Sequence, residues 1–419
     1  MSFPTMMSSA TATGGADTAS LMESLHQHLV PLKPLPYASY YKGEISLLPF
    51  LSDKYLSLLA PILIYWASSL WFHLLDTLQL PFFEKYRLHE PAEIAARNRV
   101  SAKRVIVMVL FQQVVQTILG IFVLEGEETV RKQVFADHEA AMANIAMRVA
   151  HVAVATVGFK NGAKILQMLG PWFVHWLYWW GIPAFQLGWA FLVMDAWQYF
   201  LHRAFHESRF LYKHFHSHHH RLYVPYAFGA LYNHPFEGLL LDSAGGAVAH
   251  AAAFMTVRQG ILLFTFSTMK TVADHGGYAF PPWLDPLHLL FPNTAEYHDV
   301  HHQMQGLRYN YSQPYFVHFD ILFGTRMSAE KFAKMRAVND KLKREKWAVD
   351  KAANGSEATV ATGAAGSATK ASTRRRIGAE VHDDVSPGEV ARRAAADGVG
   401  DITTTLDQES YREKAGVVT

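Results

Sequence analysis

Histidines at repeated short spacings are the side chains of this sequence best suited to chemistry. Three segments, HRAFH, KHFHSHHH and EYHDVHH, carry histidines three or four residues apart, a spacing that brings the rings to one face of a helix. One such pair is more often plain helix surface or core than a set of ligands. Three in one chain predict a metal site. The histidines concerned are His202 and His206 in the first segment, His216, His219 and His220 in the second, and His298, His301 and His302 in the third.

The number and type of these side chains limit which metals the site can hold. One transition ion takes about four to six ligands and an active one keeps a position open, so eight imidazoles imply two ions. The chain has no cysteine, which excludes thiolate ligands, and neutral imidazole suits iron, zinc or copper better than magnesium or calcium. Paired metals can activate water for hydrolysis or, if they are iron, dioxygen. The ligand type alone does not decide between these reactions.

Other histidines and several carboxylates lie close to the three segments. His275 in ADHGGY and His234 in YNHPFEG are each either a structural histidine or a further ligand. His214 and His218 fall off the shared face, and we expect them to be solvated. Metal-bound imidazoles usually donate their second N–H to a carboxylate or a carbonyl. The candidate carboxylates are Asp195, Glu237, Asp274 and Asp299.

The segments that must position these histidines are apolar enough for a membrane. Hydrophobic residues make up 50% of the chain and aromatic residues 13%, and four apolar stretches approach or exceed the roughly 20 residues that cross a bilayer core. The fourth stretch is too long for one span and is interrupted at Arg258, Gln259 and Gly260, which predicts a helical hairpin. The four stretches cover approximately residues 55–80, 105–124, 171–201 and 239–272.

Basic residues predict the orientation of these spans. The loop between the first two stretches is rich in Lys and Arg, so the positive-inside rule places it in the cytosol. Counting crossings onward places residues 202–238 and the chain after 273 on the same side. We interpret a weakly amphipathic segment near 143–158 as a helix that does not span. The predicted fold is therefore all-α, a multi-pass transmembrane helical bundle with a cytosolic helical cap that carries a histidine-rich di-metal site.

Composition divides the chain further. We expect a partly disordered N-terminal segment over 1–50, without a cleaved signal peptide. The first two spans, their loop and the amphipathic helix occupy 51–170, a catalytic domain 171–335, and a tail 336–419 that is largely disordered from about residue 350. The net charge of +2 argues against a nucleic-acid partner. No GxGxxG motif opens a βαβ unit, so we expect electrons to come from an external donor.

The three histidine segments resemble the fatty acid hydroxylase and sterol desaturase superfamily of membrane di-iron enzymes. The surrounding sequences DAWQYFLHRAFH, FLYKHFHSHHHRLYVPYAFGALYNHPFEGLLLD and FPNTAEYHDVHHQ are most similar to the sphinganine C4-hydroxylases of that superfamily, also called sphingolipid C4-monooxygenases. The resemblance covers roughly residues 35–330 and includes the loop YRLHEPAEIAARNRVS. It departs from the common pattern at Ala273 and Gly276, where related sequences carry an acid and a cysteine.

The resemblance implies a reaction and a set of ligands. The reaction is hydroxylation at C4 of the long-chain base of sphinganine or dihydroceramide, which gives phytosphingosine or phytoceramide in sphingolipid biosynthesis. It implies two non-haem iron ions, dioxygen as co-substrate, and electrons from NADPH through cytochrome b5 and its reductase, in the endoplasmic reticulum membrane with the site facing the cytosol. The implied metal ligands are His202, His206, His216, His219, His220, His275, His298, His301 and His302.

Three alternatives remain at this point. The same scaffold could act as a sterol C4-methyl oxidase, a sterol desaturase or a fatty acid 2-hydroxylase, although the segment LYVPYAFGALYNHP favours the sphingoid base. A zinc-dependent membrane hydrolase would work without oxygen or reductant. A metal transporter or sensor would place its histidines within the spans, whereas here they follow the spans.

Overall fold

The computed structural model describes residues 27–31, 33–342 and 344, and this part of the chain is helical, with two isolated β-bridges. The predictions for residues 1–20 and for the tail beyond 350 lie outside the described residues. The chain divides into two compact units. Unit 1 comprises Met1–Pro61, Leu119–Val193 and Ala247–Thr265, and unit 2 comprises Ile62–Ile118, Met194–Gly246 and Phe266–Thr419.

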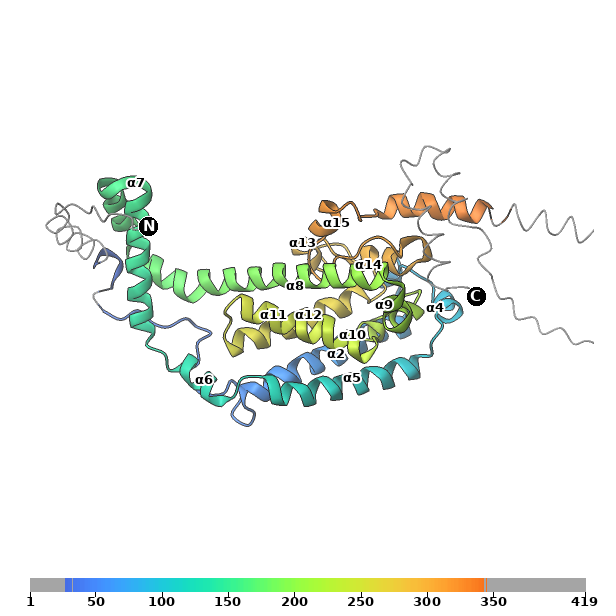
Figure 1. Cartoon of the computed structure of the whole chain (residues 1–419), viewed down its shortest axis with the longest axis horizontal. Helices are drawn as coiled ribbons and strands as arrows, with labels where there is room; N and C mark the ends of the chain where they lie inside the picture. The colour runs from blue at the N-terminus through green and yellow to red at the C-terminus, as the bar shows by residue number, and fades with distance from the viewer. Residues whose placement is uncertain (1–26, 32, 343, 345–419) are drawn as a thin grey trace, which may run out of the picture. The chain divides into compact units, whose positions relative to one another are not determined.

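Three helical stretches in the described part of the chain are long and apolar enough to cross a membrane, and they confirm the first three predicted spans. They are α2 (Asp53–Leu78), α5 (Ala102–Val123) and the stretch His138–Glu207. The last contains α7 (His138–Trp176), a π-helical turn at Leu177–Gly181 and α8 (Ile182–Glu207) (Figure 1). Gly158 and Gly170 interrupt α7 with φ of 77° and 63°, values that glycine adopts without steric cost.

The fourth predicted stretch forms two helical arms, but its break lies earlier than predicted. A π-helical turn at Leu239–Ala244 continues into α11 (Gly245–Ala252), and α12 (Val257–Asp274) follows a turn. Thr256 causes the early break: its Oγ accepts from Gln259 N (3.3 Å), while Gln259 Oε1 accepts from Thr256 N (2.7 Å). This reciprocal pair is a capping box that begins a helix. Arg258 therefore lies in the first turn of α12 and pairs with Asp53 at 2.7 Å.

Unit 1 packs an N-terminal segment against α7. A core of Leu29, Ala146, Ala150, Leu166 and Val174 holds them together. The helix predicted near 143–158 lies within α7. α6 (Glu127–Val134) precedes it and packs Val130 and Val134 against Val257.

Unit 2 holds the predicted histidines. One core joins α2 and α5 to residues 222–232 and to Val272 and Tyr278, and a second joins Val300 and Tyr309 to residues 327–342. Figure 1 shows the short helices α4, α9 and α14 at the end of α8 that carries His202 and His206. The short helices of this unit are α3 (Pro81–Glu84), α4 (Pro91–Arg97), α9 (Arg209–His214), α10 (Pro235–Gly238), α13 (Leu287–Leu290), α14 (Ala295–His302) and α15 (His318–Leu322).

Candidate metal centre

The first histidine pair lies in the last two turns of α8. His202 and His206 are four residues apart on this helix and are 1% and 0% exposed. Their i, i+4 spacing turns both rings to the same side, as the sequence predicts.

The second histidine segment follows α9 as a 3-10 helix, His216–Arg221. His216, His219 and His220 are all buried, but they do not share one site as the spacing suggested. His219 and His220 are adjacent, and their ring planes lie 86° apart. The segment therefore presents rings in two directions.

The third segment forms α14, which Thr294 begins by accepting a hydrogen bond from Tyr297 N at 3.2 Å. His298 and His302 lie one turn apart on this helix, whereas the rings of His301 and His302 are again 86° apart. His275, just after α12, lies with its Nε2 3.0 Å from that of His298. The structure thus brings His275 to the other histidines.

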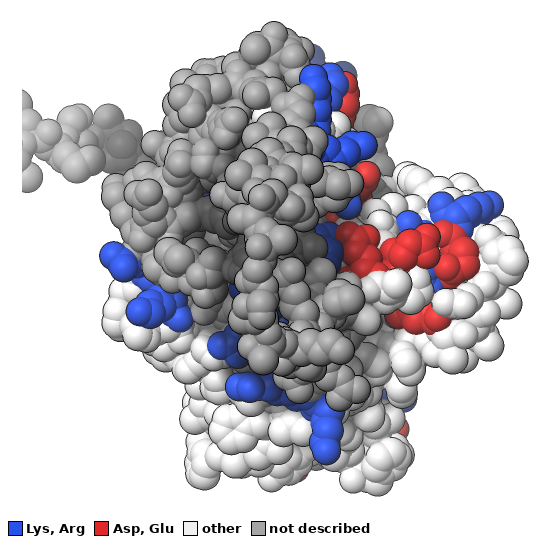
Figure 2. Space-filling model, turned by 90° about the vertical axis from the view of Figure 1, so that its right-hand side faces the viewer, with Lys and Arg blue, Asp and Glu red and all other residues white. Residues whose placement is uncertain are grey.

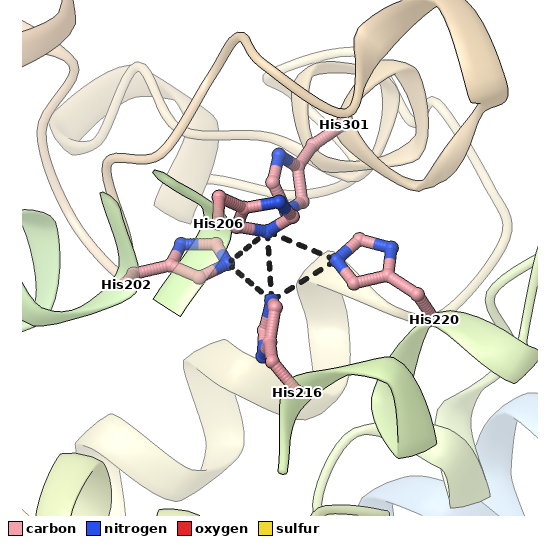
Figure 3. A group of neighbouring side chains, drawn as sticks. All are labelled: His202, His206, His216, His220 and His301. Carbon is pink, nitrogen blue, oxygen red and sulfur yellow. Dashed lines mark hydrogen bonds between the residues drawn. The ribbon is translucent and has the colours of Figure 1, made fainter. Parts of the chain in front are cut away.

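All nine predicted histidines gather into two buried groups. Within each group the nitrogen atoms that could serve as ligands lie within 4.8 Å of one another. Figure 3 shows the rings of the first group pointing toward a common centre. The first cluster is His202, His206, His216, His220 and His301, and the second cluster is His219, His275, His298 and His302.

The Nε2 atoms approach one another at distances typical of ligands that share an ion. In the first cluster His206 and His216 are 2.7 Å apart and His216 and His220 are 3.0 Å apart. In the second, His298 and His302 are 3.0 Å apart. A metal–imidazole bond of about 2.1 Å places two ligand atoms at a right angle about 3.0 Å from each other.

Hydrogen bonds on the far side of the rings fix which nitrogen faces inward. A carbonyl oxygen only accepts, so His202 Nδ1 donates to Tyr311 O (2.8 Å) and His302 Nδ1 donates to Leu222 O (2.8 Å). The Nε2 atom of a neutral ring then carries a lone pair. Lone pairs about 3 Å apart repel unless a cation lies between them. Nitrogen donors without cysteine suit iron, zinc or copper, so the residues fit a pair of transition ions.

Burial keeps these rings neutral and therefore able to bind metal. Desolvation lowers the pKa of His216 to about 3. Desolvation, together with the neighbouring His216, lowers the pKa of His219 to about 4. The same cause shifts the pKa of His220, His298, His301 and His302 well below the usual value. At neutral pH no proton competes with a metal at these nitrogens.

Of the four carboxylates expected beside the rings, the structure places one in contact with a cluster imidazole. Glu237, on α10, pairs with His216 Nδ1. Asp195 instead accepts from the backbone N–H groups of Tyr315 and Phe316, Asp274 pairs with Lys270, and Asp299 pairs with His89. Most of the other rings donate to backbone carbonyls, which sequence patterns do not show.

The remaining histidines of these segments lie outside both clusters. His234 caps α10 by accepting from Phe236 N at 3.2 Å. His218 contacts Phe215 O at 3.1 Å. His214 is exposed, as predicted, whereas His218 is partly buried.

Sequence reasoning missed the loop that orients two rings of the first cluster. His301 Nδ1 donates to Tyr309 O (2.7 Å), next to the Tyr311 carbonyl that His202 uses. Asn310, between them, has φ of 57°, and its side chain donates to Tyr297 O and Met327 O. Asn tolerates this left-handed conformation better than most residues, which is the one local signal in the sequence.

Asp320 holds the other side of the same loop. Its carboxylate accepts from Tyr311 N (3.0 Å) and Ser312 N (2.7 Å) and also from the hydroxyls of Tyr297 and Thr325. The residue is 0% exposed, so these four donors compensate a buried charge.

Comparison with known proteins agrees with this geometry. The model of the fatty acid hydroxylase family matches residues 187–325, which contain both clusters. A sphingolipid C4-hydroxylase of Schizosaccharomyces pombe is 44% identical over 65% of this chain and 87% of its own length. A sphinganine C4-monooxygenase of Arabidopsis thaliana is 40% identical over 66% of this chain and 88% of its own.

A very-long-chain aldehyde decarbonylase of Oryza sativa is also 40% identical, over 66% of this chain and 90% of its own length. No solved structure matches the chain. Three findings point to the same family. They are the helices able to span a membrane, the buried histidine clusters and the relatives that match over most of their own length. This membrane protein therefore belongs to the fatty acid hydroxylase family, and within it to the sphingolipid C4-hydroxylases.

Proposed function

We propose that the chain hydroxylates C4 of the sphingoid long-chain base, converting sphinganine or dihydroceramide to phytosphingosine or phytoceramide, with dioxygen as co-substrate. The observation that carries this proposal is the pair of buried histidine clusters in a chain 44% identical to a sphingolipid C4-hydroxylase. We assign the activity to the catalytic domain predicted over residues 171–335.

Two iron ions are the proposed cofactors, one in each cluster. The first would be held by His202, His206, His216, His220 and His301, and the second by His219, His275, His298 and His302. Bound iron would supply the chemistry that activates dioxygen. The chain orients the ligands through backbone carbonyls and Glu237, and it keeps water away because each ring is at most 6% exposed. Four ligands leave the second ion more room for a further group than five leave the first.

Surface charge supports a proposal for the side of the membrane on which the site lies. Lys85, Arg99, Lys103 and Arg104 are exposed in or beside the loop between α2 and α5. Figure 2 looks at the side where α4 and α14 lie in Figure 1 and shows Lys and Arg on the described surface beside a group of Asp and Glu. A basic loop favours the cytosolic side. We propose that the site faces the cytosol at the endoplasmic reticulum and receives electrons from NADPH through cytochrome b5 and its reductase.

Expression in cells that lack their own sphingoid C4-hydroxylase tests the reaction. Mass spectrometry of long-chain bases should show C4-hydroxylated base with the intact chain and none with His301→Ala at equal expression. His214→Ala is a matched control, because His214 is exposed and outside both clusters. Absence of the product from well-expressed protein would refute the sphingoid proposal, and sterol and fatty acid products should then be measured in the same extracts.

The relative from Oryza sativa supplies a second candidate reaction. Its name describes an aldehyde decarbonylase, and its identity to this chain equals that of the Arabidopsis monooxygenase. Alkanes formed from added very-long-chain aldehydes, without any hydroxylated base, would favour this second reaction.

A further inference from the structure

The segment 86–99 between α2 and α5 holds the second cluster from outside. We propose that this segment, which we name the clamp, positions the four histidines of the second cluster and sets the metal affinity of that cluster separately from the first. The inference rests on the two-metal site proposed above. The clamp contains α4 and lies outside the residues 187–325 that match the family model.

The first contact of the clamp is with the residues that follow His275. Leu88 N donates to Gly277 O (2.9 Å), and Ala279 N donates to Tyr86 O (2.8 Å). Arg87 bridges to Tyr278 in the backbone, and its guanidinium lies 4.9 Å from the Tyr278 ring centre. These contacts fix the chain two residues after the His275 ring.

The second contact is with the residues that follow His219. Asn98 pairs with Val224 in both directions, since its Nδ2 donates to Val224 O (2.9 Å) and its Oδ1 accepts from Val224 N (2.9 Å). Arg99 N donates to Arg221 O at 2.9 Å. Leu222, between these two anchors, provides the carbonyl that accepts from His302 Nδ1. The clamp therefore fixes the partner that orients His302.

The third contact is with α14 itself. His89 lies between two carboxylates, with Nδ1 2.9 Å from Glu93 and Nε2 2.8 Å from Asp299. Gln303 donates to the same Asp299 oxygen at 3.2 Å and to Tyr223 O at 2.8 Å. His89 is 7% exposed and Asp299 is 8% exposed. Hydrogen bonds to charged groups in such places are stronger than exposed ones.

Through these three contacts, the clamp binds residues close in sequence to each histidine of the second cluster. Asp299 and Gln303 flank His298 and His302 on α14, and the other two contacts follow His219 and His275. The first cluster has a different support, because His202 and His301 donate to the loop at Tyr309–Tyr311, which Asp320 holds. The two ions would thus have separate outer supports, and loss of such partners typically weakens metal binding about 10–100-fold.

Metal content of the purified full-length protein in detergent tests the inference. The informative variants are Asn98→Ala, which removes two hydrogen bonds without leaving a buried charge, and His89→Ala with His89→Gln as the conservative rescue. Glu90→Ala is the matched control in the clamp, because Glu90 is exposed and its side chain makes no capping bond to α4. Iron per chain is measured after dialysis against graded chelator, together with thermal unfolding.

We expect Asn98→Ala and His89→Ala to lose one ion at about 10-fold lower chelator than the wild type and to keep the other, while His89→Gln recovers part of the affinity. Adding His275→Ala to Asn98→Ala should then change little, whereas adding His202→Ala should remove the remaining ion. Joint loss of both ions, or unchanged binding of both, would overturn the clamp. A wild type that binds no pair of ions would instead refute the proposed di-metal function.

Discussion

His219 and His220 are neighbours in the sequence, yet they belong to different clusters, with ring centres 5.7 Å apart and planes at 86°. His301 and His302 repeat this relationship at 5.9 Å and 86°. In each HxxHH segment the first and last histidines are four residues apart. His216 and His220 both belong to the first cluster, whereas His298 and His302 both belong to the second cluster. Each HxxHH segment therefore supplies histidines to both clusters.

This division predicts which pairs of substitutions remove both ions. The double variant His219→Ala with His302→Ala damages the second cluster alone and should still bind one ion per chain. The variant His219→Ala with His301→Ala damages both clusters and should bind none tightly. Both proteins lose one ring from each HxxHH segment, so they serve as controls for each other. Equal metal content in the two would contradict the division, and elemental analysis of purified protein measures it.

The sequence predicted the helical class, three spans and eight of the nine gathered histidines, because each depends on local spacing or hydropathy. His275 was expected as a ligand only through the resemblance to the superfamily. The sequence did not predict how His219 separates from His216 and His220, since a 3-10 helix turns successive rings differently from an α-helix. It also missed the carbonyls of Tyr309 and Tyr311. A backbone oxygen becomes the hydrogen-bond partner of a ring only when a distant loop folds against the site, and no side-chain type in the sequence indicates this.

Acid should destabilise the metal-free protein. His219 has a pKa of about 4 in the fold, caused first by burial, against about 6.5 unfolded. The unfolded chain then binds more protons below pH 6.5, so stability falls as pH falls from 6.5 toward 4. At pH 5 the cost is about 2 kcal/mol from His219 alone, and the other lowered histidines outside the spans act in the same direction.

Glu237 opposes this trend. Burial raises its pKa to about 7, so its ionisation costs stability as pH rises from about 4.5 to 7, and acidification restores that stability. Burial raises the pKa of Asp274 to about 7 in the same way. The histidines with lowered pKa values outnumber the carboxyls with raised ones, so the net change on acidification is a loss. Thermal unfolding of chelator-treated protein between pH 7 and pH 5 measures it, with His219→Ala expected to flatten the slope and His214→Ala to leave it unchanged. A stability that rises on acidification would contradict this balance.

Gly306 should not tolerate a side chain. A Cβ at this position would lie 1.7 Å from Val300 O, which is backbone and cannot move aside without shifting α14. The turn that Gly306 makes, with Tyr309 N donating to Gly306 O at 2.8 Å, brings the Tyr309 carbonyl to His301. We expect Gly306→Ala to destabilise the fold by roughly 3 kcal/mol or more and to reduce metal at the first cluster. Gly188→Ala, in a helix with open space around it, should unfold at an unchanged or higher temperature.

Glu237 should strengthen the first cluster through His216. The carboxyl contacts His216 Nδ1 and is 1% exposed. In its ionised form, its negative charge raises the electron density at the metal-facing Nε2. Gln112 of α5 packs against the next residue, where a Cβ on Gly238 would lie 2.1 Å from its amide nitrogen, and this contact leaves α10 little room to move.

Glu237→Gln retains the shape and an accepting oxygen but removes the charge. We expect the affinity of the first cluster to fall about 10–100-fold, hydroxylation to fall with it, and the second ion to stay. Glu237→Ala should be worse in both respects, because it leaves the His216 N–H without an acceptor in a buried site. Glu296→Gln is the control, since Glu296 is an exposed carboxylate on α14. If Glu237→Gln bound both ions as the wild type does, the carboxylate would have no part in holding the metal, and its burial would be explained by packing alone.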